Sequence, residues 1–245
     1  HAHRRFAFGR RHEHGFRRHR PPAVVGVEVP CAEEHEEVEV VGDLFRGVRA
    51  IMYNSLEERA MIHAVAENRQ VPGVVVGVGS AIPERIQPWR AKRTFNLRRP
   101  YAAYIGRIDV NKGCGDLFEY FGRYAAMYPD GLDLVLAGSA VMSVPKHPRI
   151  RHIGFVSDED KFDMLGGADL LIMPSPFESL SMVALEAWAL GKPVLANGAC
   201  DVLRGQVIRS NAGLYYENFD EFAEALYALE ASGPLHQVLG RNGRE

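Results

Sequence analysis

The sequence lacks long apolar runs, and none approaches the ~20 residues that a membrane-spanning helix needs. It also lacks an apolar h-region near its beginning, so we expect no secretory signal. Cysteine is scarce: Cys31, Cys114 and Cys200 are far apart and form no CxxC pair. This spacing argues against a disulfide framework or a zinc site, and it predicts a cytoplasmic protein in a reducing compartment.

What is present is an ordinary globular composition, with 47% hydrophobic and 24% charged residues. The net charge of -2 is uneven, because residues 1–22 hold seven Arg and one Glu and also five of the ten His. This segment could be a basic arm for nucleic acid or anionic lipid, or a His-rich metal tract. Because the acidic remainder offers no second basic surface, we expect a disordered leader and no nucleic-acid partner, with peripheral membrane contact left open.

From residue 47 onward the chain alternates short β-rich runs with helical patterns. The first part predicts a strand over 48–55, a helix over 56–69 capped by Asn54 or Ser55, and a strand over 73–83 that leads into a loop. Residues 84–99 show no clear period and are interpreted as an interdomain linker. Strands are then predicted at 101–108, 132–139, 149–156, 168–175, 193–198 and 212–216, with helices at 113–128, about 158–166, about 180–190 and 220–232. This order is typical of an α/β fold with a doubly wound parallel sheet.

In such sheets, ligands bind beyond the carboxyl ends of the strands. After the strand at 101–106, Gly106 and Gly113 bracket a loop that presents Arg107 and Lys112 at the start of a helix. Cations at a helix N-terminus suit a phosphate or diphosphate. The alternative is that Arg107 and Lys112 are ordinary surface residues of a loop, because the sequence pattern would be the same. After the strand at 132–138, the small residues Gly138 and Ser139 would let a ligand approach the backbone.

Asp158 and Asp160 form a D-x-D pattern, which other sugar-transferring enzymes use to hold Mn²⁺ or Mg²⁺. Here they fall in the first turn of a predicted helix, with Ser157 or Asp158 as its cap. Acids in a first turn complement the helix dipole. We therefore interpret them as capping residues and predict no metal site.

The stretch from Pro174 to Val194 contains a helical run that is apolar all round except for Glu186. A buried Glu needs a partner, so Glu186 is either half of a buried ion pair or a ligand-binding group. Glu178 precedes the helix in a loop, and Ser179 or Ser181 can cap it. If the helical turn began at Glu178, the two carboxylates would lie about 80° apart and border one pocket. Carboxylates accept hydrogen bonds from vicinal hydroxyls, as on a ribose or a hexose.

The ordered motifs GR-x4-KG, LAGS, IGFV-x4-K and PS-x2-ES-x6-EAWALGKPV resemble the donor-binding domain of retaining GT-B-fold glycosyltransferases of family GT4. Glu178 and Glu186 match the E-x7-E motif of that family. The resemblance covers roughly residues 45–245. It implies a Rossmann-like C-terminal domain over 100–245, a linker over 84–99 and a remnant of an N-terminal acceptor domain over 23–83, with the leader at 1–22.

The resemblance also implies roles for individual residues. Arg107 and Lys112 would contact the diphosphate of the donor, Glu178 would hold the hydroxyls of the transferred sugar, and Glu186 would bind the ribose. The backbone around Phe155 and Val156 would meet the base, and that of Phe177, Ser179, Leu180 and Ser181 would help to bind the sugar and phosphate. The other implied donor-binding residues are Gly106, Gly138 and Ser139. The implied reaction needs no metal or cofactor. The acceptor hydroxyl attacks on the face that the leaving diphosphate occupies, and this phosphate takes the proton.

The resemblance is incomplete in the first half of the chain. The Gly-rich loop of the acceptor domain and the His near the reacting sugar have no counterpart, and the crossing C-terminal helix is absent, so we interpret the chain as truncated at both ends. The first hypothesis is a retaining glycosyltransferase that uses a nucleotide-diphosphate sugar and an unknown glycan, lipid or small-molecule acceptor. The second is a catalytically silent nucleotide-sugar-binding module. A third, an epimerase or NAD enzyme, is disfavoured in its NAD version because no G-x-G-x-x-G follows residue 106.

Overall fold

The computed structural model describes residues 40 and 42–245. The predicted leader at 1–22, and residues 23–39 of the predicted N-terminal remnant, lie outside the described residues. In chain order the elements are β1 (Ile51–Tyr53), α2 (Leu56–Ala66), β2 (Gly73–Val75), α3 (Pro88–Thr94), β3 (Tyr101–Ile105), the 3₁₀ turn η1 (Val110–Lys112), α4 (Cys114–Met127), β4 (Asp133–Ala137), β5 (Ile150–His152), α5 (Asp158–Gly167), β6 (Leu170–Met173), α6 (Met182–Ala189), β7 (Val194–Asn197), α7 (Asp201–Ser210), β8 (Gly213–Tyr216), α8 (Phe219–Ala231) and α9 (Gly233–Asn242).

The main sheet has six parallel strands in the order β5-β4-β3-β6-β7-β8. The first strand of this sheet, β3, lies in its middle. The chain continues outward through β4 and β5 and then returns, so that β6 pairs with the other side of β3. The predicted doubly wound parallel sheet is therefore confirmed. Its connections diverge between β3 and β6, and this is the point where such folds bind ligands.

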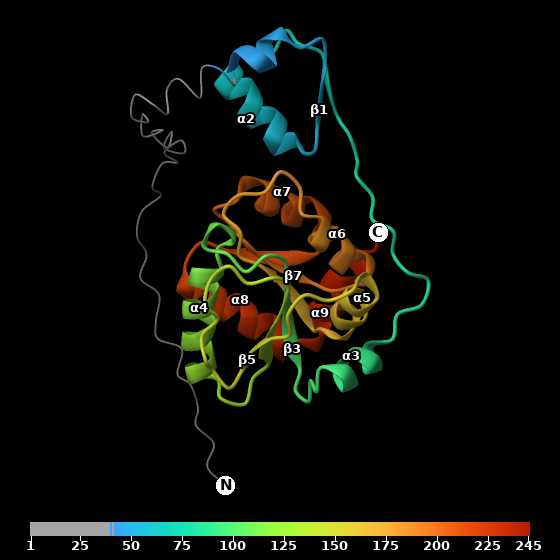
Figure 1. The fold of residues 1–245 in the computed structure, drawn as a ribbon, viewed down its shortest axis with the longest axis vertical. Coiled ribbons are helices and arrows are strands. Elements are labelled where there is room, and N and C mark those ends of the chain that lie inside the picture. Colours follow the sequence, from blue (N-terminus) through green and yellow to red (C-terminus); the bar gives the residue numbers. More distant parts are fainter. Residues whose placement is uncertain (1–39, 41) are drawn as a thin grey trace, which may run out of the picture.

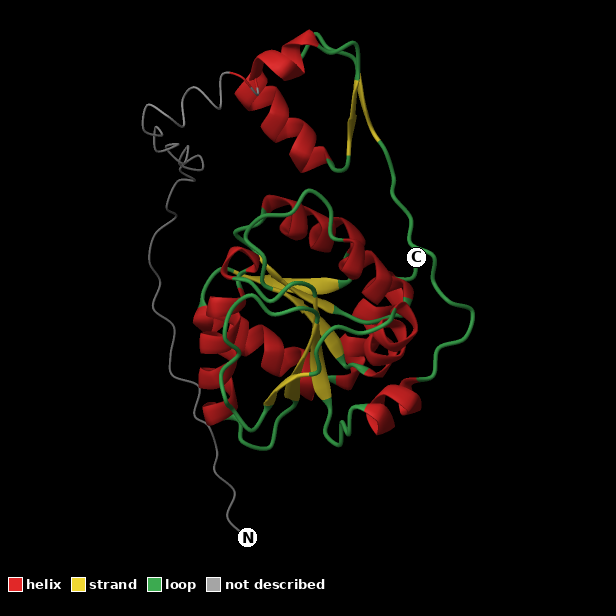
Figure 2. Ribbon diagram, viewed as in Figure 1, coloured by secondary structure: helices red, strands yellow, loops and turns green. Residues whose placement is uncertain are grey.

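Helices cover both faces of this sheet (Figure 2). Side chains alternate along β3, so Ala103 packs with residues of α5, α6 and α7, whereas Ala102 and Tyr104 pack with residues of α4, α8 and α9. The strands are apolar on both faces, as parallel strands buried between helical layers require. The two apolar cores hold the strands in place, and the polar side chains lie in the loops that follow the strands.

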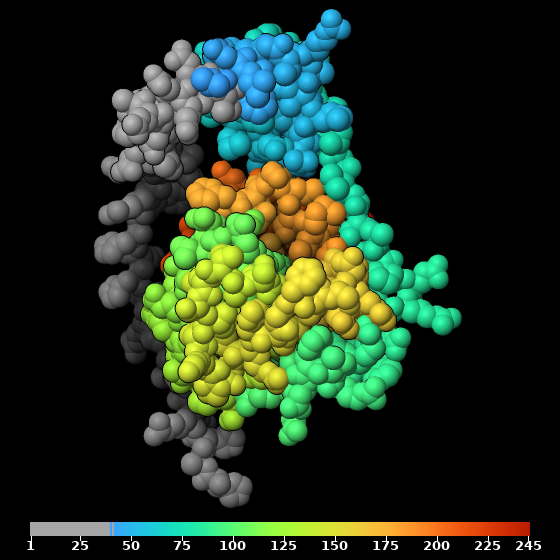
Figure 3. Space-filling model, in the orientation of Figure 1, coloured from blue at the N-terminus to red at the C-terminus, as the bar shows by residue number. Residues whose placement is uncertain are grey.

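A smaller unit consists of β1, α2 and β2, with β1 and β2 paired in parallel. Its core contains Tyr53, Ile62 and Ala66. Ser55 is the N-cap of α2, because its hydroxyl accepts a hydrogen bond from the backbone N–H of Glu58. The unit stands beside α6 and α7 of the main domain, and residues 76–87 run down from β2 to α3 (Figures 1 and 3). We call residues 76–87 the strap.

The helices α3, α7 and α9 were not expected from the sequence. Residues 84–99, which the sequence predicts as an interdomain linker, contain α3, and this helix packs against α5. Arg90 of α3 donates to the buried Asp163 of α5, and Ala91 is buried between them. The short length of α3 explains why no period was visible. No helix was predicted at α7 or α9 either.

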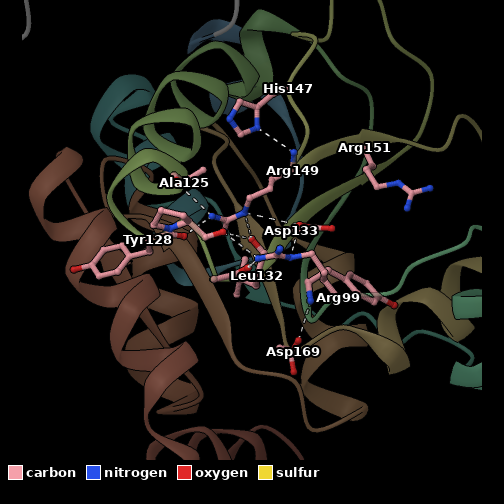
Figure 4. Close-up of polar contacts among 12 residues, drawn as sticks. Arg99, Ala125, Tyr128, Leu132, Asp133, His147, Arg149, Arg151 and Asp169 are labelled. Carbon is pink, nitrogen blue, oxygen red and sulfur yellow. Dashed lines mark hydrogen bonds and ion pairs between the residues drawn. The ribbon is translucent and has the colours of Figure 1, made fainter.

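The amino ends of the strands carry a buried arginine (Figure 4). Arg149, just before β5, donates from Nε to the carbonyl of Leu132 at 3.0 Å and from Nη1 to that of Ala125 at 3.2 Å. Asp133 lies 3.3 Å from Arg99 Nε and 3.8 Å from Arg149 Nε. Burial raises the pKa of Asp133, and the neighbouring Arg99 and Arg149 oppose that rise. This network satisfies carbonyls at the end of α4 and in the loop before β4, so it supports the edge of the sheet that faces away from the switch point.

Candidate functional site

The candidate site lies where the loops after β3 and β6 leave the sheet. These two strands are neighbours, but their connections run to opposite sides. The β3 loop carries Arg107 and Lys112, and the β6 loop carries Glu178. The parallel sheet thus places side chains that are far apart in sequence at one edge, as the sequence predicted.

Lys112 and Glu178 form an ion pair across these loops. Lys112 Nζ donates to Glu178 Oε1 at 2.8 Å, with side-chain exposures of 36% and 15%. Lys112 is fixed by η1, whose N-cap is Asp109: this carboxylate accepts from the backbone N–H of Asn111. The pair places one cation and one carboxylate side by side, so it can meet a phosphate and a hydroxyl of the same ligand.

Arg107 is more exposed than Lys112. Its Nε lies 2.9 Å from Asp109 Oδ2, and 56% of its side chain is exposed. Asp109 therefore holds one edge of the guanidinium, while the remaining N–H groups stay available. A guanidinium in this state can bind an anion in two-pronged fashion.

Gly113 lets the two loops touch. Its φ is +70°, and a Cβ at this position would lie 2.1 Å from the carbonyl oxygen of Pro174. Gly113 is also the N-cap of α4 and supplies no side chain to cap the first turn. The first-turn N–H groups of α4 are therefore not occupied by a capping side chain, and they begin beside Lys112.

Ser181 is the N-cap of α6, as one of the two predicted alternatives stated. Its hydroxyl accepts from the backbone N–H of Ala184 at 3.2 Å. The helix begins at Met182, so the assumption of a helical turn from Glu178 was wrong, because Pro176 and Phe177 hold the chain in a loop. That loop is closed locally by Ser175, whose hydroxyl donates to the carbonyl of Phe177 at 2.9 Å.

Glu186 is almost fully buried on α6, with 4% of the residue exposed. Its Oε1 accepts from Lys161 Nζ at 2.9 Å and from Ser80 Oγ at 2.7 Å. Its Oε2 is buried and has no hydrogen-bond partner. The structure therefore contains the ion pair that was one of the two interpretations of Glu186, and it also leaves one oxygen of this carboxylate unpaired.

Two cavities meet at the Lys112–Glu178 pair. The smaller, of about 220 Å³, runs from the β3 loop to the start of α6, and it is lined by Tyr104, Ile105, Gly106, Arg107, Lys112, Met173, Ser175, Glu178, Leu180, Ser181, Met182 and Val183. The larger, of about 580 Å³, opens between α2, the β6 loop and the start of α7, and it is lined by Glu57, Glu58, Met61, Lys112, Pro176, Phe177, Glu178, Ser179, Ala199, Cys200, Asp201 and Val202. We call them the inner and the outer cavity. Lys112 and Glu178 line both.

Some predicted binding residues do not line either cavity. Glu186 contacts Ser80 and Lys161 instead, so the two Glu of the motif do not border one cavity here. Close packing explains the glycine at position 138, because a Cβ there would lie 1.9 Å from the carbonyl oxygen of Gly106. Ser139, Phe155 and Val156 are outside both cavities. Phe155 is 86% exposed, and its ring is free to meet a planar group.

Sequence reasoning missed several residues of the site. Tyr104 lines the inner cavity and donates from its hydroxyl to the carbonyl of Arg107 at 2.7 Å. Burial raises the pKa of Tyr104, and contact with Cys114 and the charges of Glu178 and Asp109 raise it further, so this hydroxyl stays protonated. Tyr104 could have been identified from the sequence, because it lies near the carboxyl end of a predicted strand, two residues before Gly106. Lys161 was part of a quoted motif but was given no role.

Asp158 and Asp160 lie in the first turn of α5, where they were predicted, but neither of them is the N-cap. Ser157 is the N-cap of α5 and accepts from the backbone N–H of Asp160 at 3.1 Å. Asp160 also lies 3.3 Å from Arg90. Among residues 40 and 42–245, no group of His, Cys, Asp and Glu is arranged to hold a metal ion.

The fold and the site define an α/β protein with a doubly wound parallel sheet and a charged pocket at its switch point. The chain belongs to the family described as glycosyl transferases group 1, whose model matches residues 85–245. The match begins just before α3, which agrees with the packing of α3 on the main domain. It includes all of the candidate site except Ser80 and the part of the outer cavity that α2 lines.

Among curated relatives, the chain is 31% identical over 121 residues to a glycogen synthase of Mycobacterium tuberculosis, covering 44% of this chain and 29% of the relative. The chain thus spans less than a third of that protein. Among solved structures, the sucrose-phosphate synthase of Thermosynechococcus elongatus has a TM-score of 0.69 at 23% identity, covering 86% of this chain and 56% of that one. HepE of Anabaena, solved with UDP and with UDP-glucose, has a TM-score of 0.70 at 17% and 16% identity respectively, covering 87% of this chain and 64% of that one. These structures share the GT-B-type fold.

In the part of the chain that the structure describes, no helix is long and apolar enough to cross a membrane.

Proposed function

We propose that the chain binds a nucleotide-diphosphate sugar at the β3–β6 switch point and transfers the sugar to an acceptor hydroxyl with retention of configuration. The observation that carries this proposal is the meeting of Arg107, Lys112 and Glu178 at the inner cavity, with the Lys112–Glu178 pair also lining the outer one. Family membership and the UDP and UDP-glucose titles of the HepE structures support a donor of this class.

The diphosphate belongs in the inner cavity. Arg107 and Lys112 line this cavity and supply fixed positive charge. The first turn of α4, which follows Lys112 and has no capping side chain, would add backbone N–H donors to the diphosphate. The backbone of Gly106 lies on the wall, and Leu180 and Ser181 line the opposite side. As the bond between the anomeric carbon and the diphosphate breaks, negative charge grows on the leaving phosphate. Preorganised cations and N–H groups stabilise that charge.

The transferred sugar belongs where the two cavities meet. Glu178 Oε1 is held by Lys112, so its carboxylate is oriented to accept hydrogen bonds from sugar hydroxyls. Phe177 and Ser179 line the outer cavity on the same loop. An acceptor hydroxyl entering through the outer cavity would bond to the anomeric carbon on the face that the diphosphate leaves. The proton of this hydroxyl passes to the leaving phosphate, so the step needs no metal or other cofactor.

The nucleoside belongs toward α5 and α6. The unpaired Oε2 of Glu186 would accept from the ribose hydroxyls, and the exposed Phe155 with the neighbouring Val156 would meet the base. Gly138 and Ser139 would contribute backbone at the end of β4.

Cys114 and Cys200 are both free thiols, which supports a chain that works in the reducing cytoplasm.

A screen of UDP-, GDP- and ADP-sugars by thermal shift tests this proposal, because a bound donor raises the melting temperature by mass action. We expect one base to be preferred and slow donor hydrolysis to be measurable. Failure to bind any nucleoside diphosphate would reject the proposal.

A second candidate is a nucleotide-sugar-binding module without activity of its own. The chain spans 29% of the glycogen synthase and 64% of HepE, so similarity alone does not carry the activity of a whole relative over to it. Binding of a donor with neither hydrolysis nor transfer, measured with a sensitive nucleotide-release assay, would select this candidate.

A further inference from the structure

The strap contacts the candidate site at one position, Ser80. Residues 77–79 and Ala81 are exposed, whereas Ser80 is half-buried. Its hydroxyl donates to Glu186 Oε1 at 2.7 Å, which joins two residues that are 106 positions apart. Neither residue has a neighbour in sequence that would predict this contact. The hydrogen bond therefore ties the strap to the wall of the proposed nucleoside site.

Both donors to Glu186 use the same oxygen. Ser80 and Lys161 bond to Oε1, at 2.7 Å and 2.9 Å, while Oε2 is buried without a partner. A buried carboxylate oxygen is normally hydrogen-bonded, since leaving it unpaired is costly. Two donors on one oxygen fix the rotation of the carboxylate group and define which oxygen stays unpaired.

A competing interpretation is that the Ser80 hydroxyl fills the place of a ligand hydroxyl and must leave when the ligand binds. The geometry disfavours this interpretation, because Ser80 shares Oε1 with Lys161 and leaves Oε2 without a hydrogen-bond partner. A group that mimicked the ligand would bond to the unpaired oxygen. Ser80 and the ligand can therefore bond to Glu186 at the same time.

We propose that Ser80 is a positioning residue of the nucleotide site: it holds Glu186 so that Oε2 faces the ribose hydroxyls of the donor. This inference rests on the proposed function and adds to it a residue outside the part of the chain that the family model matches. It also makes ribose recognition depend on the strap, and thus on the segment that joins the two units.

The test compares Ser80→Ala with Ser80→Thr, which keeps the hydroxyl. The control is Ser143→Ala at an exposed position in the loop after β4. Each protein is titrated by calorimetry with the nucleoside diphosphate that the wild type prefers and with its 2′,3′-dideoxy form. We expect Ser80→Ala to weaken binding of the ribonucleotide about tenfold and that of the dideoxy form by less than about twofold, because only the former uses Glu186 Oε2. Ser80→Thr and Ser143→Ala should keep the wild-type ratio of the two constants.

Three results would overturn the assignment of Ser80 while leaving the proposed function standing. The first is a Ser80→Ala protein with the wild-type ratio of the dissociation constants for the dideoxy and ribose forms. The second is tighter ribonucleotide binding in Ser80→Ala, as the competing interpretation requires. The third is an equal decrease of this ratio in Ser80→Ala and Ser80→Thr. If the wild type binds no nucleoside diphosphate, the proposed function fails and the Ser80 assignment fails with it. Urea unfolding of each variant identifies any loss that comes from misfolding.

Discussion

Lys112 Nζ lies 2.8 Å from Glu178 Oε1, and this pair lines both the inner and the outer cavity. A cation assigned to the diphosphate and a carboxylate assigned to the sugar thus touch before any ligand is bound. Each side chain orients the other. The two proposed roles are consequently coupled, and a change at one residue alters the other.

Lys112→Ala should weaken nucleoside diphosphate binding by about 10- to 100-fold, because it removes a charged donor and leaves Glu178 unpaired next to the phosphates. Binding of the uncharged nucleoside should change by less than about threefold. Arg107→Ala should show the same selectivity. Calorimetric titration with both ligands measures it, with the exposed Lys146→Ala as the matched control. Equal losses for both ligands would refute the phosphate role.

Gly113→Ala should disturb the contact between the β3 and β6 loops. A Cβ would lie 2.1 Å from the Pro174 carbonyl oxygen, and φ is +70°, so we expect a loss of about 2 kcal/mol or more in the free energy of unfolding, together with weaker diphosphate binding. Gly122→Ala is the control, since a Cβ on this α4 residue meets nothing within 4 Å. It should stabilise the protein by about 0.5 to 1 kcal/mol through helix propensity. Urea denaturation of both variants measures the difference, and similar behaviour would contradict the close approach.

Glu186→Gln should reduce the preference for a ribonucleotide over its 2′,3′-dideoxy analogue. The amide replaces an acceptor that two donors now hold, and its NH₂ group cannot accept from Lys161 or from the ribose. The ratio of the two dissociation constants is the measurement. A ratio equal to that of the wild type would leave Glu186 with the role of an ion-pair partner for Lys161 alone.

Arg149→Met should destabilise the fold by about 2 to 4 kcal/mol while leaving nucleotide affinity unchanged. The substitution removes donors from loop carbonyls and leaves the buried Asp133 with one fewer cation (Figure 4). Its position at the amino ends of the strands separates it from the site. Arg98→Met, at an exposed position, should change stability by less than about 0.5 kcal/mol. A large loss of affinity in Arg149→Met at full stability would show a coupling between the two edges of the sheet.

Stability should fall at alkaline pH. Burial raises the pKa of Tyr101, Tyr104, Tyr124 and Tyr216 above the ordinary value of about 10. A group whose pKa is raised in the folded state contributes its full stability below the unfolded pKa, and this contribution is lost as the pH rises above about 10. Urea midpoints should therefore decrease from that pH upward. The tyrosinate absorbance of these residues should appear together with unfolding and not before it.

The strands of the main sheet and the loops that carry the site could be predicted from the sequence, because both depend on local patterns. Apolar runs end at Gly106 and Gly138, and Ser181 precedes an apolar helix that Gly191 ends with a φ of +69°. From these, the meeting of Arg107, Lys112 and Glu178 follows once the strands are parallel. The sequence does not state the order of strands directly, but right-handed crossovers leave few alternatives.

The contacts that were missed depend on distant residues. Ser80 and Glu186 lie on segments with no shared period, and only the folded chain brings them together. The helix α3 buries little beyond Ala91, so its hydrophobic pattern is too weak to see, although Pro88 at its first position is a start signal. The mixed polar pattern of α7, with Gly205 and Gln206 in its middle, hid that helix in the same way.

The strap has one more consequence, which concerns how firmly the small unit is held. Glu57 of α2 pairs with Arg209 of α7, with side-chain exposures of 19% and 44%, and such a pair is weak between separate molecules. Here the partners share one chain, and a covalent tether raises the effective concentration of each partner, to about the millimolar range for short linkers. Contacts too weak to hold two free proteins together therefore suffice to keep α2 beside α7. Because one of them is a partly exposed ion pair, ionic strength should set how much of the time the outer cavity is covered.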